Sequence, residues 1–412
     1  MKLGRMAWRN LWRRRRRTWI TAFTIAFGLM FSVTIIAISD YSHTNMITTS
    51  ATMGFGNLTL EPAGYNETPM PDKRLRDADA ARERIQGLPG VTSAIVRITG
   101  QAMFASAAQS VGGTFIGIDP AQESAERNIF LRALTEGSLF EGPGGSGAVV
   151  GAKMAEHLNL RIGKKLVFTS TDIHDEIVSE IVRVTGIFRT GVAEVDGYVV
   201  LLPIDTVRNA LHYGPHEATI VSVFIDDYRK AGPMRETIAS AVGNPDRAVL
   251  TWDETQPDMA GLVNLDRRMH FLLQFLVALL IAAGILNTIL MGVMERTREF
   301  GIMMAVGLSP GALFRLVLAE SFWVGLVGIL AGIVITTPWF FYMSRTGIDI
   351  RGLIEGGYSV GGAVVEPIIK FRLYKESVVA ILLEIISLSL IAGLYPAFKA
   401  GRIPPVESLK KI

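Results

Sequence analysis

The chain has 412 residues, of which 49% are hydrophobic and 19% charged, with a formal net charge of +3. This composition is too apolar for an ordinary soluble protein but not apolar throughout, so the chain must combine membrane-spanning and soluble parts. It contains no cysteine, which excludes disulfide bonds and thiol chemistry.

The N-terminal segment 1–17 is strongly basic and contains no acidic residue; its charges are Lys2, Arg5, Arg9 and the run Arg13 to Arg17. Residues 18–39, which follow, carry no charge and meet the need of about 20 apolar residues for a membrane-spanning helix. Because basic residues stay on the cytoplasmic side, the N-terminus is expected inside. Alternatives are a cleaved signal peptide, which the length of the apolar stretch disfavours, and a nucleic-acid patch or twin-arginine signal. An anchor near anionic lipid headgroups explains the arginines better.

Three further segments are long and apolar enough to span a membrane. Residues 271–294 contain no charged side chain, whereas residues 316–344 and 377–398 contain one acid each, Glu320 and Glu384. Alternation then places residues 40–270 outside, and the remaining parts follow: an inner segment 295–315, an outer loop 345–376 and an inner tail 399–412. We expect Glu320 to reach the inner interface and Glu384 to be structural more than functional. Gly328 and Gly332 form a weak Gly-x-x-x-Gly motif.

Residues 40–270 have the composition of a folded α+β domain of two lobes, inserted between the first and second spans of a membrane α-helical protein. Short runs with β-branched enrichment or alternation predict strands at 57–61, 94–98, 114–118, 165–169, 181–187 and 221–225. Periodic segments predict helices at 77–86, 153–159 and 233–242.

Catalytic and cofactor motifs are not evident. The glycine-rich run Gly142 to Gly147 lacks the lysine of a P-loop, and the six histidines show no metal-ligand spacing. We therefore expect a non-catalytic chain with no cofactor, metal or nucleic-acid partner of its own.

The inner segment is the most informative stretch. Residues 295–310 read as a short amphipathic helix, charged in its first turn and apolar afterwards, that ends at Gly307 and Ser309-Pro310. A plain connecting loop is the alternative. The sequence Glu295-Arg296-Thr297-Arg298-Glu299-Phe300-Gly301-Ile302-Met303 closely resembles the coupling helix of permease subunits in the MacB/FtsX superfamily of ABC transporters, whose FtsX-like permease domain would span about 271–406. The closing sequence Tyr395-Pro396-Ala397, followed by 400–403 and 405–409, is similar to the end of that family.

The outer domain resembles the MacB-like periplasmic core, and most closely that of the lipoprotein-releasing permeases LolC, LolE and LolF. The similar stretches are 117–120 with Glu123, 149–155 with 160–163, and 184–191. The resemblance implies a subunit of the Gram-negative inner membrane that extracts lipoproteins from the outer leaflet by mechanical transmission. Implied partners are a cytoplasmic LolD-like ATPase dimer that binds ATP and magnesium, a second permease chain (identical or LolC/LolE-type), membrane lipids and a LolA-like periplasmic carrier.

In such a transporter, residues 295–303 would contact the ATPase: Glu295, Arg296, Arg298 and Glu299 through ion pairs or hydrogen bonds, and Phe300, Ile302 and Met303 in an apolar groove. The first two spans are expected to continue outward as a stalk. A substrate cavity could be lined by residues at helical spacing, although these could equally face lipid or another helix: Phe23, Phe27, Phe31, Met259, Leu262, Val263 and Met269. Two other functions stay open, a MacB-like exporter component and an FtsX-like signal transmitter to a periplasmic hydrolase. The size of the outer domain disfavours the second.

Overall fold

The computed structural model describes residues 3–13, 15–349, 358–360, 363–365 and 368–402. These divide into a helical unit, 1–42 with 265–349 and 368–412, and an outer unit, 43–264 with 350–367. The closing sequence 403–409 lies outside the described residues.

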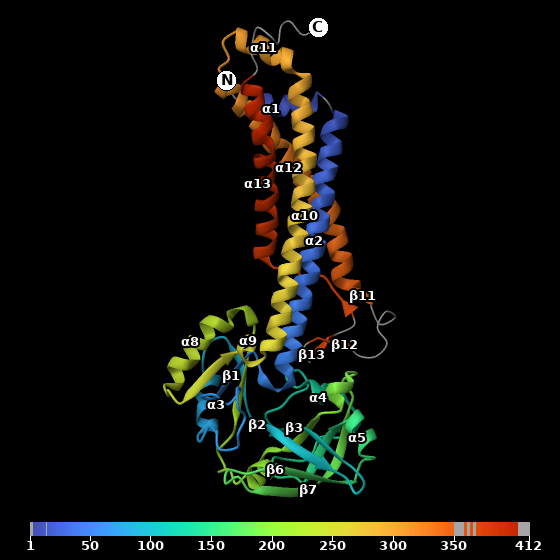
Figure 1. The fold of residues 1–412 in the computed structure, drawn as a ribbon, viewed down its shortest axis with the longest axis vertical. Helices are drawn as coiled ribbons and strands as arrows, with labels where there is room; N and C mark the ends of the chain where they lie inside the picture. Colours follow the sequence, from blue (N-terminus) through green and yellow to red (C-terminus); the bar gives the residue numbers. More distant parts are fainter. Residues whose placement is uncertain (1–2, 14, 350–357, 361–362, 366–367, 403–412) are drawn as a thin grey trace. The chain divides into compact units, whose positions relative to one another are not determined.

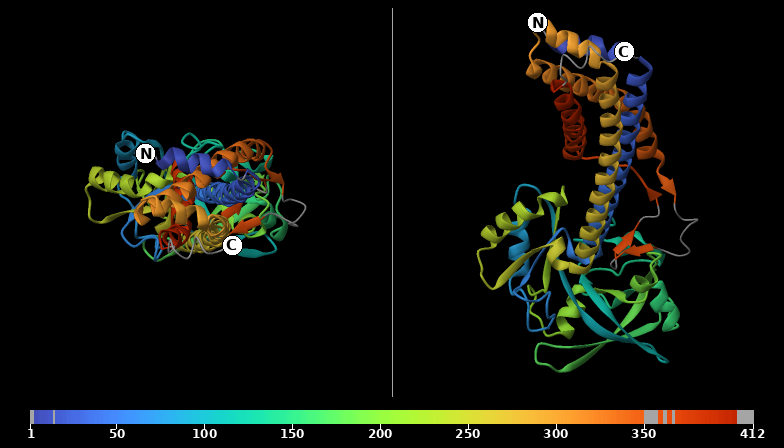
Figure 2. Two further views of the ribbon diagram at one scale, coloured as in Figure 1. Left: turned by 90° about the horizontal axis from the view of Figure 1, so that it is seen from above. Right: turned by 45° about the horizontal axis from the view of Figure 1, so that its top comes forward.

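The helical unit is built on four long helices that run side by side (Figures 1 and 2). They are α2 (Arg15–Ser50), α10 (Pro257–Glu295), α12 (Pro310–Thr346) and α13 (Lys375–Gly401). Each contains an 18-residue window with a mean hydropathy of at least 2.1, sufficient for a membrane span. The four expected spans are confirmed, with the large domain inserted after the first. All four helices are longer than the apolar segments; α2 runs 11 residues beyond Ser39 to Ser50.

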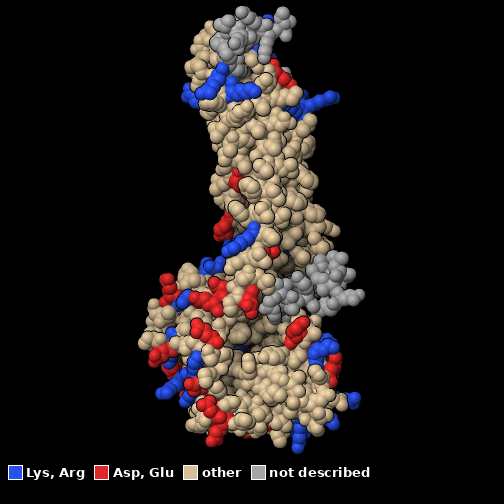
Figure 3. All heavy atoms as spheres, viewed as in Figure 1, with Lys and Arg blue, Asp and Glu red and all other residues tan. Residues whose placement is uncertain are grey.

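The basic N-terminus is itself helical, which the sequence reading missed. Helix α1 (Leu3–Trp12) packs on α12, where Trp8 stacks edge-on against Trp323 with ring centroids 5.0 Å apart. The Trp323 indole N–H donates to the carbonyl of Gly4 at 3.2 Å. Figure 3 shows basic side chains gathered at one end of the helical unit, whose adjoining helical surface is almost free of charge on the face viewed.

Close helix contacts hold this unit together. A Cβ at Gly328 would lie 2.6 Å from the Cβ of Ile25, and a Cβ at Gly332 would lie 3.1 Å from the Cα of Ala26. The Gly-x-x-x-Gly pair therefore allows α12 to approach α2 closely. Helices α12 and α13 meet in the same way, because Gly325 faces Ser389 and Gly393 faces Ser321.

The outer unit contains a ten-stranded sheet in the order β10-β1-β9-β2-β3-β8-β5-β7-β4, with β6 paired to β2 and β7. Its strands are β1 (Leu58–Pro62), β2 (Val91–Ala105), β3 (Ser110–Ile118), β4 (Leu134–Gly137), β5 (Gly147–Gly151), β6 (Lys165–Thr171), β7 (Ile177–Phe188), β8 (Val199–Pro203), β9 (Ile220–Ile225) and β10 (Arg247–Thr251). The pairs β3–β8 and β5–β7 are parallel and the others antiparallel.

Strand β2 joins two halves of this sheet. Its residues 91–97 pair with β9, and its residues 98–105 pair with β3. The predicted strand 94–98 is much shorter, because Gly100 reads as a turn signal in the sequence. In the structure the ring of Phe115 covers Gly100, where an added Cβ would lie 2.6 Å from the Phe115 Cζ atom, so the glycine serves close packing inside a strand.

Helices lie around this sheet (Figure 1). They are α3 (Ala78–Gln86), α4 (Ile129–Arg132), α5 (Ala152–His157), α6 (Ala193–Asp196), α7 (Ile204–Ala210), α8 (Ala231–Val242) and α9 (Trp252–Thr255). The three predicted helices correspond to α3, α5 and α8, and α8 begins two residues before Pro233. In the outer loop, β11 (Ile348–Asp349) pairs with β14 (Ile368–Ile369), and β12 (Tyr358–Val360) pairs with β13 (Ala363–Val365).

Glu61 on β1 makes the stability of the outer unit dependent on pH. Burial raises the pKa of this carboxyl to about 7, although the Asn66 N–H and the nearby Lys73 favour its charged form. The folded state therefore keeps a proton that the unfolded state releases above pH 4.5. We expect the free energy of unfolding to fall by about 3 kcal/mol as pH rises from 4.5 through 7.

Glu61→Gln should remove that fall, because its side chain stays neutral at every pH. Hydrogen exchange of β1 in the full chain, measured between pH 5 and pH 8 and corrected for the intrinsic exchange rate, checks this. Glu236→Gln, at an exposed position that is not among the groups acting on Glu61, should keep the pH dependence of the parent protein.

Candidate functional site

The inner segment forms a short helix between two spans. Helix α10 ends at Glu295 and α11 covers Thr297–Ala305. Gly307 follows with a φ of 104°, in the left-handed region that favours glycine. Ser309 then caps α12, accepting a hydrogen bond from the N–H of Ala312 at 3.3 Å, with Pro310 in the first turn. The predicted end of this helix is confirmed.

Arg296 fixes α11 to the spans. Its Nη1 donates to Glu320 Oε1 at 2.9 Å and to Oε2 at 3.2 Å, and its Nε donates to Glu299 Oε2 at 3.1 Å. Asn10 Nδ2 on α1 donates to the same Glu320 oxygen at 2.9 Å. From its position in the sequence, Glu320 was expected to reach the inner interface. In the structure it instead accepts hydrogen bonds from Asn10 and Arg296. It is the common acceptor that connects α1, the inner segment and α12.

The N-terminal arginines pair with the same segment. Arg17 contacts Glu295 at 3.1 Å and donates to the backbone carbonyl of Thr288, while Arg13 contacts Glu299 at 3.4 Å. Asn10, Arg13, Arg17, Arg296, Glu299 and Glu320 border a cavity of about 250 Å³. Besides contributing positive charge, the basic N-terminus is thus a structural partner of the inner segment.

Of the nine predicted contact residues, several point into the chain itself. Phe300 is fully buried in the core of the helical unit, with the Arg296 guanidinium 4.9 Å from its ring centroid. Its position does not fit the expected role in a partner's groove. Gly301 is buried, Met303 packs partly on the same core, and the Thr297 hydroxyl donates to the carbonyl of Met294 at 2.8 Å.

The outward face of the inner segment, unlike the side with Phe300, carries side chains that are exposed. Arg298 is exposed, Ile302 is 47% exposed, and Val306, which sequence reasoning did not select, is 84% exposed. Two large aliphatic side chains at i and i+4 beside an arginine form an apolar patch with a basic neighbour. We call Arg298, Ile302 and Val306 the α11 outer face. In the sequence, this face is indicated by the helical period alone. In a helix as short as α11, that period does not decide which of two faces points outward.

Glu320→Gln should weaken the attachment of α11, because Arg296 loses its charged partner on α12. We expect the opening free energy of α11, measured by hydrogen exchange of the full chain, to fall by about 2 kcal/mol. Glu299→Gln, at a side chain that is 41% exposed, should cost less than about 1 kcal/mol. Equal effects of the two variants would contradict a central role for Glu320.

Glu384 is also paired inside the helical unit. Gln274 Nε2 on α10 lies 2.8 Å from Glu384 Oε2 on α13 and 2.8 Å from Ser32 Oγ on α2. Among the described residues, Gln274 Oε1 has no hydrogen-bond partner. Glu384 thus belongs to a polar bridge between three spans, which agrees with a structural role.

The residues predicted for a substrate cavity differ in burial. Phe23, Phe27 and Phe31 share an exposed face of α2, with exposures of 53%, 65% and 46%. Met269 and Leu262 are also exposed on α10. In the outer unit, by contrast, Met259 and Val263 are almost fully buried against Met46 and Ile47. These last two belong to a packed helix pair, so they are not cavity-lining residues.

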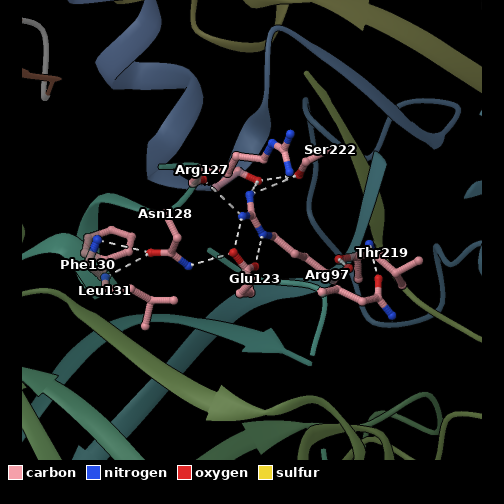
Figure 4. Close-up of polar contacts among 11 residues, drawn as sticks. Arg97, Glu123, Arg127, Asn128, Phe130, Leu131, Thr219 and Ser222 are labelled. Atoms are coloured by element: carbon pink, nitrogen blue, oxygen red, sulfur yellow. Dashed lines mark hydrogen bonds and ion pairs between the residues drawn. The ribbon is translucent and has the colours of Figure 1, made fainter. Parts of the chain in front are cut away.

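Sequence reasoning missed a buried ion pair in the outer unit (Figure 4). Arg97 on β2 and Glu123 are both fully buried, and their two contacts measure 2.7 Å and 2.8 Å. Arg97 Nη1 also donates to the carbonyl of Gly54 at 2.7 Å, and Ser222 donates to the same oxygen. Gly54 lies in the π-helical turn η1 (Ala51–Phe55), where α2 enters the domain. Asn128, which caps α4, donates to Glu123 at 3.1 Å.

Metal ligands do not gather at any of these places. Within the residues that the structure describes, no group of three or more His, Cys, Asp or Glu side chains could hold a metal ion. His212 and His216 instead pair with Asp172 and Asp79, at 2.8 Å and 2.9 Å.

The chain is thus a membrane protein with four candidate spans, an inserted α+β domain and a short inner helix tied to the spans. The chain matches the MacB-like periplasmic core domain over residues 18–238 and the FtsX-like permease C-terminal region over residues 271–405. The first match alone covers more than half of the chain. The chain therefore belongs to the MacB/FtsX superfamily of ABC transporter permeases, as its inner segment indicated.

The curated relatives include both lipoprotein-releasing and export proteins. The chain is 23% identical over 334 residues to the lipoprotein-releasing system transmembrane protein LolC of Neisseria meningitidis, covering 78% of each chain. It is 25% identical over 277 residues to LolE of Haemophilus influenzae, covering 66% of this chain and 65% of the relative. It is also 26% identical over 423 residues to the pyoverdine export ATP-binding/permease protein PvdT of Pseudomonas entomophila, covering 98% of this chain and 58% of the relative.

Among solved structures, the periplasmic region of MacB from Actinobacillus actinomycetemcomitans is 15% identical, with a TM-score of 0.35. The match covers 49% of this chain and 91% of that chain.

Proposed function

We propose that this chain is the membrane subunit of an ABC transporter that extracts lipoproteins from the outer leaflet of a Gram-negative inner membrane. A separate cytoplasmic ATPase dimer supplies the energy, a second permease chain completes the complex, and a soluble periplasmic carrier receives the cargo. The relatives named for lipoprotein release support this cargo, because they match most of their own length and most of this chain.

The observation that carries the coupling step is the α11 outer face. Its apolar side chains Ile302 and Val306 are exposed beside Arg298, while the opposite side of α11 is held by Phe300 and the Arg296–Glu320 pair. A helix that is rigidly attached on one side and apolar on the other can receive a push from a partner and pass it to the spans. The proposed ATPase contact therefore keeps Ile302, as expected from the sequence, and has Val306 instead of the buried Phe300.

A second candidate is an exporter component of the MacB kind. It is favoured by the PvdT relatives, which match 98% of this chain. Those relatives are named ATP-binding/permease proteins, and the chain spans only 58% of their length. In that case the same α11 outer face would meet an ATPase, but the cargo would be a soluble compound.

Affinity purification of the full chain from native membranes, followed by mass spectrometry, tests the proposal. We expect to recover an ABC ATPase, one permease species and triacylated lipoprotein. Recovery of an ATPase with an outer-membrane channel and no lipoprotein would favour the exporter. Recovery of a peptidoglycan hydrolase would overturn both.

A further inference from the structure

The outer unit contains a cavity of about 690 Å³ that the coupling mechanism does not use. It lies between the C-terminal half of β2, the adjoining ends of β6 and β7, and the segment Pro69–Pro71. Its volume is in the range of small-molecule binding sites. None of its described lining residues is charged, in a domain whose surface carries many charged side chains (Figure 3).

Several polar groups of the lining are paired with one another. The Tyr65 hydroxyl donates to the carbonyl of Thr99 at 2.5 Å, and the Tyr213 hydroxyl donates to the carbonyl of Pro71 at 2.6 Å. The N–H of Thr99 donates to Thr219 Oγ1 at 2.8 Å. Burial raises the pKa of both phenols, as expected in surroundings of low polarity. A ligand that enters this cavity therefore meets no charged side chain, and the buried hydroxyls of Tyr65, Tyr213 and Thr219 are already engaged.

Large apolar side chains complete the lining. Phe115 is almost fully buried, whereas Met70 and Met103 are 42% and 47% exposed and Ile177 is 81% exposed. Exposed methionines are adaptable apolar contacts, since their side chains are unbranched and polarizable. The cavity thus combines an apolar wall with apolar side chains that remain open to solvent.

We propose that this cavity receives one acyl chain of the lipid-anchored cargo. A hydrocarbon chain needs neither a counter-charge nor hydrogen bonds, and this lining offers no charge, while its buried hydroxyls are already engaged. A charged ligand would lose its hydration without gaining an ion pair. An extended peptide would bury backbone groups against the hydroxyls of Tyr65, Tyr213 and Thr219, which are already engaged. That the acyl chain belongs to a lipoprotein rests on the proposed function. That the cavity binds an acyl chain does not depend on it.

Photolabelling of the full chain in nanodiscs tests this inference. The probe is a synthetic triacylated lipopeptide with a diazirine in one acyl chain, and the adducts are mapped by mass spectrometry. We expect adducts on peptides from β2 and from the β6–β7 hairpin. Met103→Glu should reduce them at least about tenfold, because a carboxylate in an apolar lining must be desolvated.

Ile181→Glu is the matched control. Ile181 is 58% exposed and lies four residues from Ile177 on the same strand, but it does not line the cavity. Its adducts should equal those of the parent protein. Adducts confined to the spans, or unaffected by Met103→Glu, would overturn the acyl site. Equal labelling of the cavity by a diazirine phospholipid in the nanodisc would overturn its assignment to cargo. Lipoprotein release with no labelling of the cavity would overturn this inference alone and leave the proposed function standing.

Discussion

Arg97→Ala should lower the opening free energy of the outer unit by about 3–5 kcal/mol. The substitution leaves Glu123 buried without its cation, and it removes one of the two side-chain donors to the carbonyl of Gly54. Hydrogen exchange of β2 in the full chain measures this loss. Lys153→Ala breaks a pair whose side chains are 51% and 55% exposed, and it should cost less than about 1 kcal/mol.

Arg97→Met combined with Glu123→Leu separates the pair from its surroundings. The double variant leaves no buried charge, so it should recover a large part of the stability that Arg97→Ala loses. It should not recover the hydrogen bond from residue 97 to Gly54, because methionine cannot donate one, and Ser222 is then the remaining donor to that carbonyl. The turn η1 is where α2 enters the domain, so we expect it to pass motion of α2 to the sheet. The double variant should then release less lipoprotein than the parent protein, while its complex continues to hydrolyse ATP. Normal release by the double variant would contradict a transmitting role for Arg97.

Ile302→Asp and Val306→Asp should each weaken binding of the ATPase at least about tenfold. Both replace an exposed apolar side chain of the α11 outer face with a carboxylate that would have to be desolvated on binding. Both sites are exposed, so the fold of the chain should not change. Titration of the purified ATPase onto the full chain in nanodiscs measures the affinity.

Two variants show whether that effect is specific. Ile162→Asp changes an isoleucine in the outer unit that is 49% exposed and should leave ATPase binding intact. Phe300→Ala should destabilise the helical unit by about 3–5 kcal/mol, because it empties a fully buried site. If Val306→Asp and Ile302→Asp bind the ATPase normally, the α11 outer face is not the contact.

The four spans could be predicted from the sequence because an apolar segment of about 20 residues with almost no charge is longer than a helix buried in a soluble core usually is. The inner segment could be recognised from the sequence of residues 295–303. Which of its side chains face outward could not be predicted from that sequence. A helix of nine residues gives too few turns to distinguish two partly apolar faces, and tertiary packing places Phe300 inside. The strands β4, β5, β8 and β10 were not predicted individually, since they are short, and β4 and β5 also contain glycine.

The long-range polar contacts could not be predicted from local patterns. Arg97 and Glu123 are 26 residues apart, and Arg296 and Glu320 are 24 apart, so each pairing exists only after the chain folds. The arginines at 13–17 were explained by membrane topology alone. Their pairing with Glu295 and Glu299 gives two of them, Arg13 and Arg17, a second role in positioning the inner segment.

ATP-dependent release from reconstituted membranes is the sharpest test of the proposed transport function. Proteoliposomes would contain the full chain, its co-purified ATPase and permease partners, and a triacylated lipoprotein, with a soluble periplasmic carrier outside. We expect transfer of the lipoprotein to the carrier that requires ATP and is lost with Val306→Asp. ATP hydrolysis with no transfer of lipoprotein, in the presence of an active carrier, would contradict the proposed function.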